Sequence, residues 1–268
     1  MSEIFYYNGD EYKTRPSYNG LGGYFAATAV SGAILAPLAY THIPIARTIE
    51  KERVNNELYK DTFYKILDES GLKDKGVTIL EAQKVKNIPN DYKIGKNAAY
   101  IPKTRQVLIN TENMMSAGFH ELGHAMNDLQ SKYGLKYLAK MRRTGYVIAG
   151  LMEYFAIFSR TKPKGAPRTF TDIIEDNCGK IAFIALVPTL IEEAAASYRG
   201  LNAAKKAGLE KSLIKNLEKM CSNAFLTYGS RAVLGGLAVY ASRKVMDAFT
   251  RPKKVKTPYS SETNFFIS

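Results

Sequence analysis

The chain has 268 residues, of which 46% are apolar, so it can bury one large core or two modest ones and is not disordered as a whole. Its two cysteines, Cys178 and Cys221, form neither a CxxC pair nor a disulfide framework, and we expect them to be small buried side chains. The formal net charge is +13, which restricts the expected partners to nucleic acid, anionic lipid or acidic protein.

The positive charges are scattered beside apolar segments, and no stretch resembles a nucleic-acid-binding module. This arrangement favours a membrane surface, although a solvated basic face would also explain it. We therefore expect contact with membrane lipid and none with nucleic acid. The basic clusters are Arg142-Arg143, Lys162 to Arg168, Lys205-Lys206 and Lys253-Lys254-Lys256.

The first 50 residues are expected to form an N-terminal segment with one candidate membrane helix. Residues 1–20 show neither a helical nor a strand period, and residues 21–38 then form an uncharged apolar run. A bilayer span takes roughly 20 residues, so this run is just about long enough. Because it is rich in Ala and Gly, it fits a membrane span and a buried helix that packs through small residues equally well.

Residues 51–250 are expected to form one domain. An amphipathic helix over residues 45–70, ended by Gly71, is predicted across its start. A short β-prone run follows at residues 77–80. Residues 98–101 and 106–109 are then predicted to be the two strands of a hairpin. A strand edge next to the following helix would hold an extended peptide by main-chain hydrogen bonds.

That helix contains the motif around which the chain is organised, His120-Glu121-Leu122-Gly123-His124. The chain has only three histidines, and these two lie four residues apart, on one face of a helix. Two such imidazoles can hold one zinc ion, and Glu121 can take a proton from water. We expect Thr111 to cap this helix, Glu112 to lie in its first turn and Gly134 to end it. Its buried stripe is predicted to consist of Met115, Phe119, Leu122, Met126 and Leu129.

A catalytic zinc needs a third protein ligand. The remaining histidine, His42, lies in a Pro-flanked loop far upstream and is a poor candidate. Glu192 and Glu193 end an apolar run and precede three alanines, which would let their helix approach the zinc helix closely. A carboxylate buried there needs a cationic partner, and a metal ion is one. We therefore expect one of these two glutamates to be the third ligand.

The rest of the chain after Gly134 is predicted to be helical. Three apolar segments are each short for a membrane span or interrupted by a charged residue. Considered one at a time, each is predicted to be a buried core helix. Taken together with residues 21–38, they favour a helical part that is embedded in or docked on a membrane. A charged amphipathic helix is expected over residues 201–224, and residues 251–268 are expected to form a basic, flexible tail. The three segments are residues 146–158, 181–191 and 232–241.

The motifs at residues 97–101 and 107–110, the HELGH sequence and the distant E-x-x-A-S sequence together resemble a gluzincin metallopeptidase. The chain is most similar to the membrane-associated kind: the CAAX prenyl proteases, their bacterial heat-shock relatives and the neutral zinc metallopeptidases of bacterial membranes. The resemblance covers roughly residues 97 to 200. It implies an α+β, mainly helical fold, with a zincin-like core, a small sheet beside the HExxH helix and additional apolar helices.

In that family the third ligand is the glutamate four residues before an Asp or Ser with Ala just ahead of it. The alignment selects Glu193, with Ser197 in the place where several relatives carry Asp; Glu192 is the fallback. The resemblance thus implies Zn²⁺ on His120, His124 and Glu193, with Glu121 as the general base of peptide-bond hydrolysis. The strand at residues 107–109 or its partner would align the substrate.

Three readings of the whole chain follow. The first is a zinc endopeptidase at or in a membrane, integral or peripheral, with its site on the cytoplasmic side and a peptide or protein as its substrate. The second is a soluble zincin whose apolar helices are all core. The third is a non-catalytic basic scaffold on a membrane surface with a structural zinc, which would need His42 or a cysteine as a fourth ligand. Arg199 is expected to pair with a glutamate rather than to stabilise an oxyanion.

Overall fold

The computed structural model describes residues 4–7, 10–13, 17–131, 134–159 and 167–254. Helices dominate, and the strands form small three-stranded sheets, which agrees with the expected mainly helical α+β class. The chain divides into two compact units that are built from separate stretches. These units do not follow the expected division of the chain at residues 50 and 250, and that division stays a prediction. Most of the expected C-terminal tail lies outside the described residues.

Unit 1 comprises Met1–Ile34, Gly150–Ala182 and Gly236–Ser268. Its sheet has the order β1-β2-β6. Strands β1 and β2 lie where the sequence showed no strand period, and β6 lies in the segment expected to be a flexible tail, where it pairs with β2. The sheet strands and the helices that contribute residues to this unit are β1 (Ile4–Tyr7), β2 (Asp10–Lys13), β6 (Lys253–Lys254), α1 (Ser17–Leu35), α6 (Leu135–Phe158), α7 (Phe170–Lys206) and α8 (Lys211–Thr250).

Unit 2 comprises Leu35–Ala149 and Phe183–Gly235, so it takes residues from α6, α7 and α8 as well. Its other elements are η1 (Ala36–Tyr40), α2 (Ile43–Glu52), η2 (Arg53–Asn55), α3 (Asn56–Glu69), β3 (Thr78–Glu81), η3 (Ala82–Lys84), α4 (Asn90–Lys93), β4 (Ala99–Ile101), β5 (Gln106–Ile109) and α5 (Met115–Gln130). The predicted stop of the amphipathic helix is confirmed, because Gly71 follows α3 with a φ of 70°.

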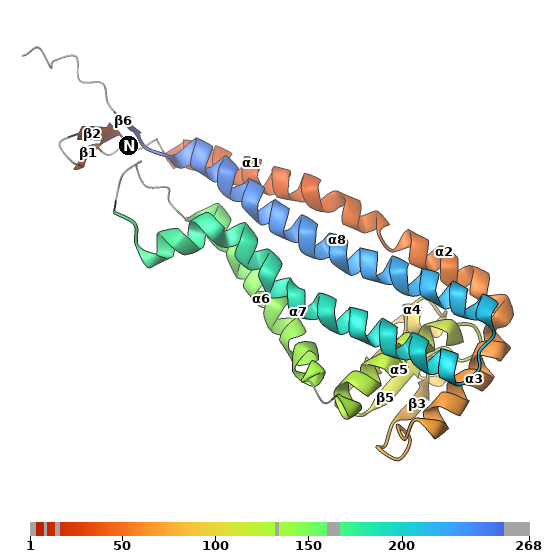
Figure 1. The fold of residues 1–268 in the computed structure, drawn as a ribbon. Coiled ribbons are helices and arrows are strands. Elements are labelled where there is room, and N and C mark those ends of the chain that lie inside the picture. The colour runs from red at the N-terminus through yellow and green to blue at the C-terminus, as the bar shows by residue number, and fades with distance from the viewer. Residues whose placement is uncertain (1–3, 8–9, 14–16, 132–133, 160–166, 255–268) are drawn as a thin grey trace, which may run out of the picture. The chain divides into compact units, whose positions relative to one another are not determined.

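The sheet of unit 2 has the order β3-β5-β4, with β5 parallel to β3 and antiparallel to β4. The predicted hairpin is therefore present. The strand around Val107 lies in the centre of the sheet, so its partner β4 forms the edge. Helix α5 packs against β4 and β5, which puts the HELGH sequence beside this edge (Figure 1).

Helix α5 begins and ends at positions other than those expected from local signals. It starts at Met115, and its first amide is capped from another helix, because Met115 N–H donates to Asn56 Oδ1 (2.9 Å). Thr111 instead accepts a hydrogen bond from Gln83, and Glu112 precedes the helix. The helix ends at Gln130, four residues before Gly134. The predicted stripe is confirmed: four of its members are buried and the fifth packs against the same core.

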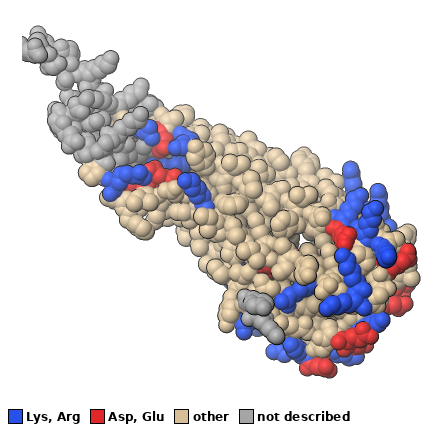
Figure 2. Space-filling view, in the orientation of Figure 1, with Lys and Arg blue, Asp and Glu red and all other residues tan. Residues whose placement is uncertain are grey.

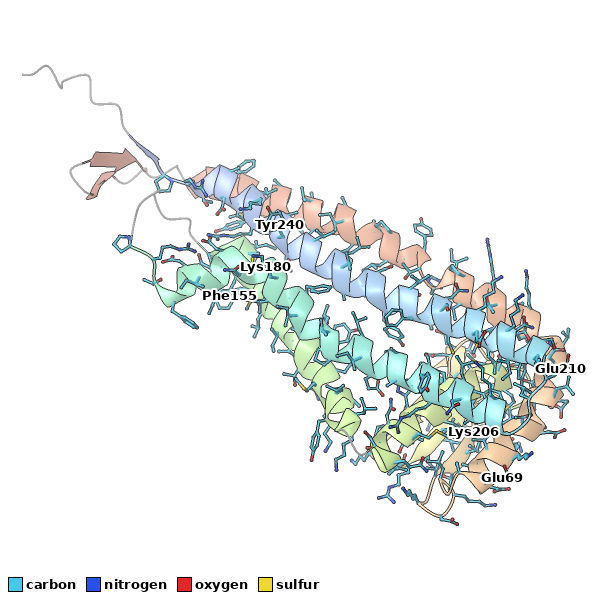
Figure 3. The ribbon with its side chains drawn as sticks, in the orientation of Figure 1. Glu69, Phe155, Lys180, Lys206, Glu210 and Tyr240 are labelled. Carbon is cyan, nitrogen blue, oxygen red and sulfur yellow. The ribbon has the colours of Figure 1, made fainter. Side chains whose placement is uncertain are left out.

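The predicted helix over residues 201–224 is interrupted. Helix α7 ends at Lys206 and α8 begins at Lys211, with Gly208 between them at a φ of 87°. That left-handed backbone favours glycine and allows the chain to reverse. Figure 3 shows Lys206 and Glu210 on the two sides of this turn. The expected apolar segment at residues 232–241 is then a continuous part of α8.

Helices α5 and α7 approach each other closely, and glycines make this contact possible. A Cβ atom on Gly123 would lie 1.9 Å from the carbonyl oxygen of Ala196, and one on Gly200 would lie 2.1 Å from that of Phe119. The expectation that three alanines allow the approach holds only for Ala196, which is fully buried, whereas Ala194 is exposed. The glycines thereby bring Glu193 to the histidine helix.

Two helical stretches, Leu21–Glu69 and Phe170–Lys206, are long and apolar enough to cross a membrane by length and composition. Only 17% of the apolar window in the first and 33% in the second is buried, so most of these residues lie at the surface. On the face drawn in Figure 2, charged side chains gather over α3 and the start of α8, whereas uncharged residues cover the middle of α8.

Candidate metal centre

The three residues predicted to bind zinc converge in unit 2. His120 and His124 lie one turn apart on α5, and their Nε2 atoms are 3.0 Å from each other. Glu193 reaches the same point from α7. Its Oε2 atom lies 3.0 Å from His120 Nε2 and 3.6 Å from His124 Nε2. The two nitrogen atoms and one oxygen atom thus form a small triangle of lone-pair donors.

The size of this triangle fits a zinc ion. Tetrahedral ligand atoms about 2.0–2.1 Å from zinc lie about 3.3 Å from one another, close to the three distances observed. Two imidazoles and one carboxylate are also a donor set that a catalytic zinc uses. Among the described residues, no fourth His, Cys, Asp or Glu joins this group. The described residues therefore offer three donors, which is the number that catalytic zinc sites use.

The charges around the triangle favour a divalent cation. The side chains of Glu121, Glu192 and Glu193 are all buried here, and Arg142 is the cation that contacts two of them. Three negative charges against one positive charge leave two negative charges. Burial alone would lower the pKa of His120. Hydrogen bonds to Cys221 and Glu193, together with the charge of Glu121, raise it well above its usual value.

Glu192, the fallback ligand, lies on the far side of His124 from the triangle. Its Oε1 atom is 2.6 Å from His124 Nδ1, the ring nitrogen that does not face the other two ligands. Asn127 Nδ2 donates to the same oxygen atom and to the backbone carbonyl of Glu192, both at 3.2 Å. The geometry therefore separates the two adjacent glutamates, with Glu193 in the triangle and Glu192 behind a histidine.

His120 has a partner at its outer nitrogen as well. Ser197 Oγ lies 3.0 Å from His120 Nδ1, so this serine is in position to orient the ring. Arg199 does not pair with a glutamate as expected: its Nη1 atom donates to the backbone carbonyl of Met126 at 2.7 Å. Arg199 lies two residues after Ser197 on α7, and its bond to Met126 helps to join α7 to the end of α5.

Glu121 faces the edge strand. Its Oε2 atom accepts a hydrogen bond from the backbone N–H of Tyr100 in β4 at 2.7 Å. The hydroxyl of Tyr100 donates to Asp128, four residues after His124, at 2.9 Å. Burial and this hydrogen bond raise the pKa of Tyr100, so its hydroxyl remains a donor at neutral pH. Strand β4 is therefore bound to α5 at both ends of the histidine motif.

Two cavities of unit 2, of about 520 and 420 Å³, meet at this site. Their walls share His120, Glu121 and Tyr228, together with residues 97 and 98 just before β4. The larger cavity extends between α2, α5 and α8, and the smaller one extends along β4 toward α6. An elongated ligand that passes from one cavity to the other would cross the carboxylate of Glu121 and the metal triangle.

Sequence reasoning missed Arg142, Asn127 and Tyr228. Arg142 comes from α6, and its sequence neighbourhood indicates only a basic cluster at a membrane surface. Its Nη2 atom contacts Glu192 Oε2 at 2.9 Å and also contacts Glu193. Asn127 is three residues after His124, so helical spacing puts the two on one face of α5, which is a usable signal. No spacing rule connects residues 142 and 228 with a motif at residue 120.

A scan against protein-family models, a search of curated proteins and a search of solved structures each returned no match for this chain.

Proposed function

We propose that this chain is a zinc-dependent metallopeptidase of the gluzincin type, which hydrolyses peptide bonds at or in a membrane. The observation that carries the proposal is the convergence of His120 Nε2, His124 Nε2 and Glu193 Oε2 within 3.0–3.6 Å of one another, next to a buried glutamate where two cavities meet. A zincin-like core is part of the same proposal, and it is supported by the packing of α5 against the sheet with β4 at its edge.

His120, His124 and Glu193 would hold the zinc ion, with Ser197 and Glu192 behind the two rings. The chemistry that zinc supplies when bound in such a site is Lewis acidity: it lowers the pKa of a water molecule and polarises a peptide carbonyl group. A three-ligand site suits this reaction better than a structural role, because structural zinc sites are closed by four protein ligands.

Glu121 is the proposed general base. Its Oε2 atom is held by the N–H of Tyr100, so the carboxylate has a fixed orientation at the junction of the cavities. In the reaction, Glu121 accepts a proton from the attacking water and later donates it to the amine that leaves. Such positioned acid–base catalysis contributes roughly 10²- to 10⁴-fold to the rate.

The surface of the apolar helical segments supports a membrane location. Large apolar side chains in all four segments are 37–71% exposed, which is costly in water and favourable among acyl chains. On α7, Ile184 and Ile191 are 64% and 48% exposed, whereas Glu192 and Glu193 are each 1% exposed. The exposed side chains are Leu21, Phe25, Tyr146, Val147, Leu151, Tyr154, Phe158, Phe183, Ile184, Ile191, Val233, Leu237 and Tyr240.

Substituting the general base tests the proposal. The Glu121→Gln variant keeps the shape of the side chain and removes its basicity. We expect it to bind one zinc per chain, as the wild type does, and to cleave a quenched fluorescent peptide library about 10²- to 10⁴-fold more slowly. Zinc is measured by atomic emission on detergent-purified protein, and cleavage is measured by fluorescence.

The matched control is Glu218→Gln, which changes an exposed glutamate on α8 that pairs with Lys205 at the surface. It should retain both zinc and activity. Unchanged activity in Glu121→Gln would exclude Glu121 as the base. Full zinc loading of a wild type that cleaves no peptide in the library would overturn the peptidase proposal.

A further inference from the structure

We propose that Glu192 is a positioning residue for His124, and that Arg142 holds Glu192 and Glu193 in their separate places. This inference rests on the metal site of the proposed function, and it concerns how that site is built before the metal arrives. It assigns a role to the glutamate that the sequence offers as an alternative ligand and to an arginine from a different helix.

The two carboxylates approach the histidines from different directions. Adjacent residues on an α-helix point about 100° apart, so Glu192 and Glu193 cannot reach one point along the same path. Glu193 approaches the Nε2 side of the rings, at 3.0 and 3.6 Å. Glu192 approaches the Nδ1 side of His124, at 2.6 Å. The helix thus delivers one carboxylate to each side of the same imidazole.

The contact with Glu192 determines the tautomer of His124. A carboxylate can only accept a hydrogen bond, so its contact with Glu192 requires the proton to reside on Nδ1. In the neutral ring this leaves the lone pair on Nε2, which is the atom that faces His120 and Glu193. A carboxylate in this position fixes the orientation of a ligating histidine and makes it a stronger donor to the metal.

Glu192 is itself held in place by side chains of two other helices. Its side chain is almost completely buried, and it accepts hydrogen bonds from Asn127 of α5 and Arg142 of α6. The Nη2 atom of Arg142 contacts both Glu192 and Glu193. Two buried carboxylates on adjacent residues repel each other, and a guanidinium between them offsets that repulsion. Three helices therefore hold Glu192 behind the histidine.

The experiment measures metal binding without reference to peptide cleavage. Zinc affinity is determined by competition with a chromophoric chelator, and the ligand set is read from the visible spectrum of the Co²⁺-substituted protein. For Glu192→Gln we expect one metal per chain, an unchanged Co²⁺ ligand set and an affinity about 10- to 100-fold lower than that of the wild type. Glu193→Gln should instead alter the Co²⁺ spectrum, because it changes a ligand.

Arg142 is tested with two variants. Arg142→Ala should lower zinc affinity in the same direction as Glu192→Gln. Arg142→Lys, which keeps the charge, should lower zinc affinity less than Arg142→Ala does. A role only in folding would lower the thermal unfolding temperature in detergent without this rescue pattern in metal affinity. Glu218→Gln is the control for loss of a glutamate that lies at the surface, and it should match the wild type in every measurement.

The outcomes separate the two proposals. Wild-type zinc affinity in Glu192→Gln, or a changed Co²⁺ ligand set in that variant with an unchanged set in Glu193→Gln, would overturn the positioning role. A wild type that binds no zinc or Co²⁺ would overturn the metal site and the positioning role together. The expected affinity pattern in a chain that cleaves no peptide would leave the positioning role standing and overturn only the peptidase function.

Discussion

Each of the two units has a cluster of buried charged residues, and the two clusters are completed differently. In unit 1, Arg243 of α8 contacts Glu175 of α7 and Asp247 of its own helix, both at 3.2 Å. It also donates to the backbone carbonyl of Ser159, and the neighbouring Ser242 bonds to Glu153. Asp247 is also paired with Arg251 at 3.5 Å, so two arginines and two acids compensate one another and the cluster joins helices.

In unit 2 the acids outnumber the arginine that contacts them, and three lone-pair donors point at one position. Two cavities reach this cluster, whereas neither of these two cavities reaches Arg243. A buried charge that the protein itself neutralises contributes structure, and a charge excess beside a cavity is suited to a cation and a substrate. The comparison therefore favours a structural role for the cluster in unit 1 and supports the proposed metal site in unit 2.

The largest expected effect is the loss of metal from the cluster in unit 2. We expect His124→Ala to lose zinc and to reduce peptide cleavage to background, because two donors no longer form the three-ligand site. Removing zinc from the wild type with a chelator should have the same effect, and adding zinc back should restore cleavage. Retention of one zinc per chain in His124→Ala would contradict the assigned ligand set.

The next effect concerns the cluster in unit 1. Arg243→Met removes the cation that contacts buried Glu175, and breaking a buried ion pair costs about 3–5 kcal/mol of unfolding free energy. We expect a lower thermal unfolding temperature in detergent, with one zinc per chain still bound in folded protein below that temperature. Loss of zinc without loss of stability would reverse the roles that the comparison assigns.

A smaller effect is expected where α5 meets α7. In Gly123→Ala the new Cβ would lie 1.9 Å from the carbonyl oxygen of Ala196, so the helices must separate. Overpacking of this kind costs about 1–3 kcal/mol. Because Glu193 lies on α7, we also expect weaker zinc binding by chelator competition. Gly150→Ala, which has no atom within 4 Å of the new Cβ, is the control and should bind zinc normally.

The smallest effect is expected at the edge strand. Tyr100→Phe removes the hydroxyl that donates to Asp128, a hydrogen bond worth about 0.5–1.5 kcal/mol. Zinc content should stay at one per chain, since the backbone N–H that holds Glu121 remains. A change in zinc stoichiometry would show that β4 takes part in metal binding. Thermal unfolding and zinc analysis on the same sample distinguish these results.

The parts of the fold that follow from short-range patterns were predictable. Periodic apolar residues indicated α3, α5 and the hairpin of β4 and β5, because helices and strands repeat their buried side chains at fixed spacings. Helix boundaries were less predictable where a distant residue decides them. Asn56 of α3 caps α5 in place of Thr111, and the left-handed Gly208 separates α7 from α8 within a pattern that reads as one helix.

The sequence by itself determined the two histidines and Glu121, because the i, i+4 spacing on one helix needs no tertiary information. It also limited the third ligand to two adjacent glutamates. Only the tertiary structure shows how each of the two carboxylates lies relative to the histidines. Glu193 lies next to the Nε2 atoms, and Glu192 lies on the opposite side of His124. The close contact of α5 and α7 at Gly123 and Ala196 determines which face of α7 is turned toward the histidines. Arg142 joins them from α6 for the same reason: packing between helices brings together residues that are far apart in sequence.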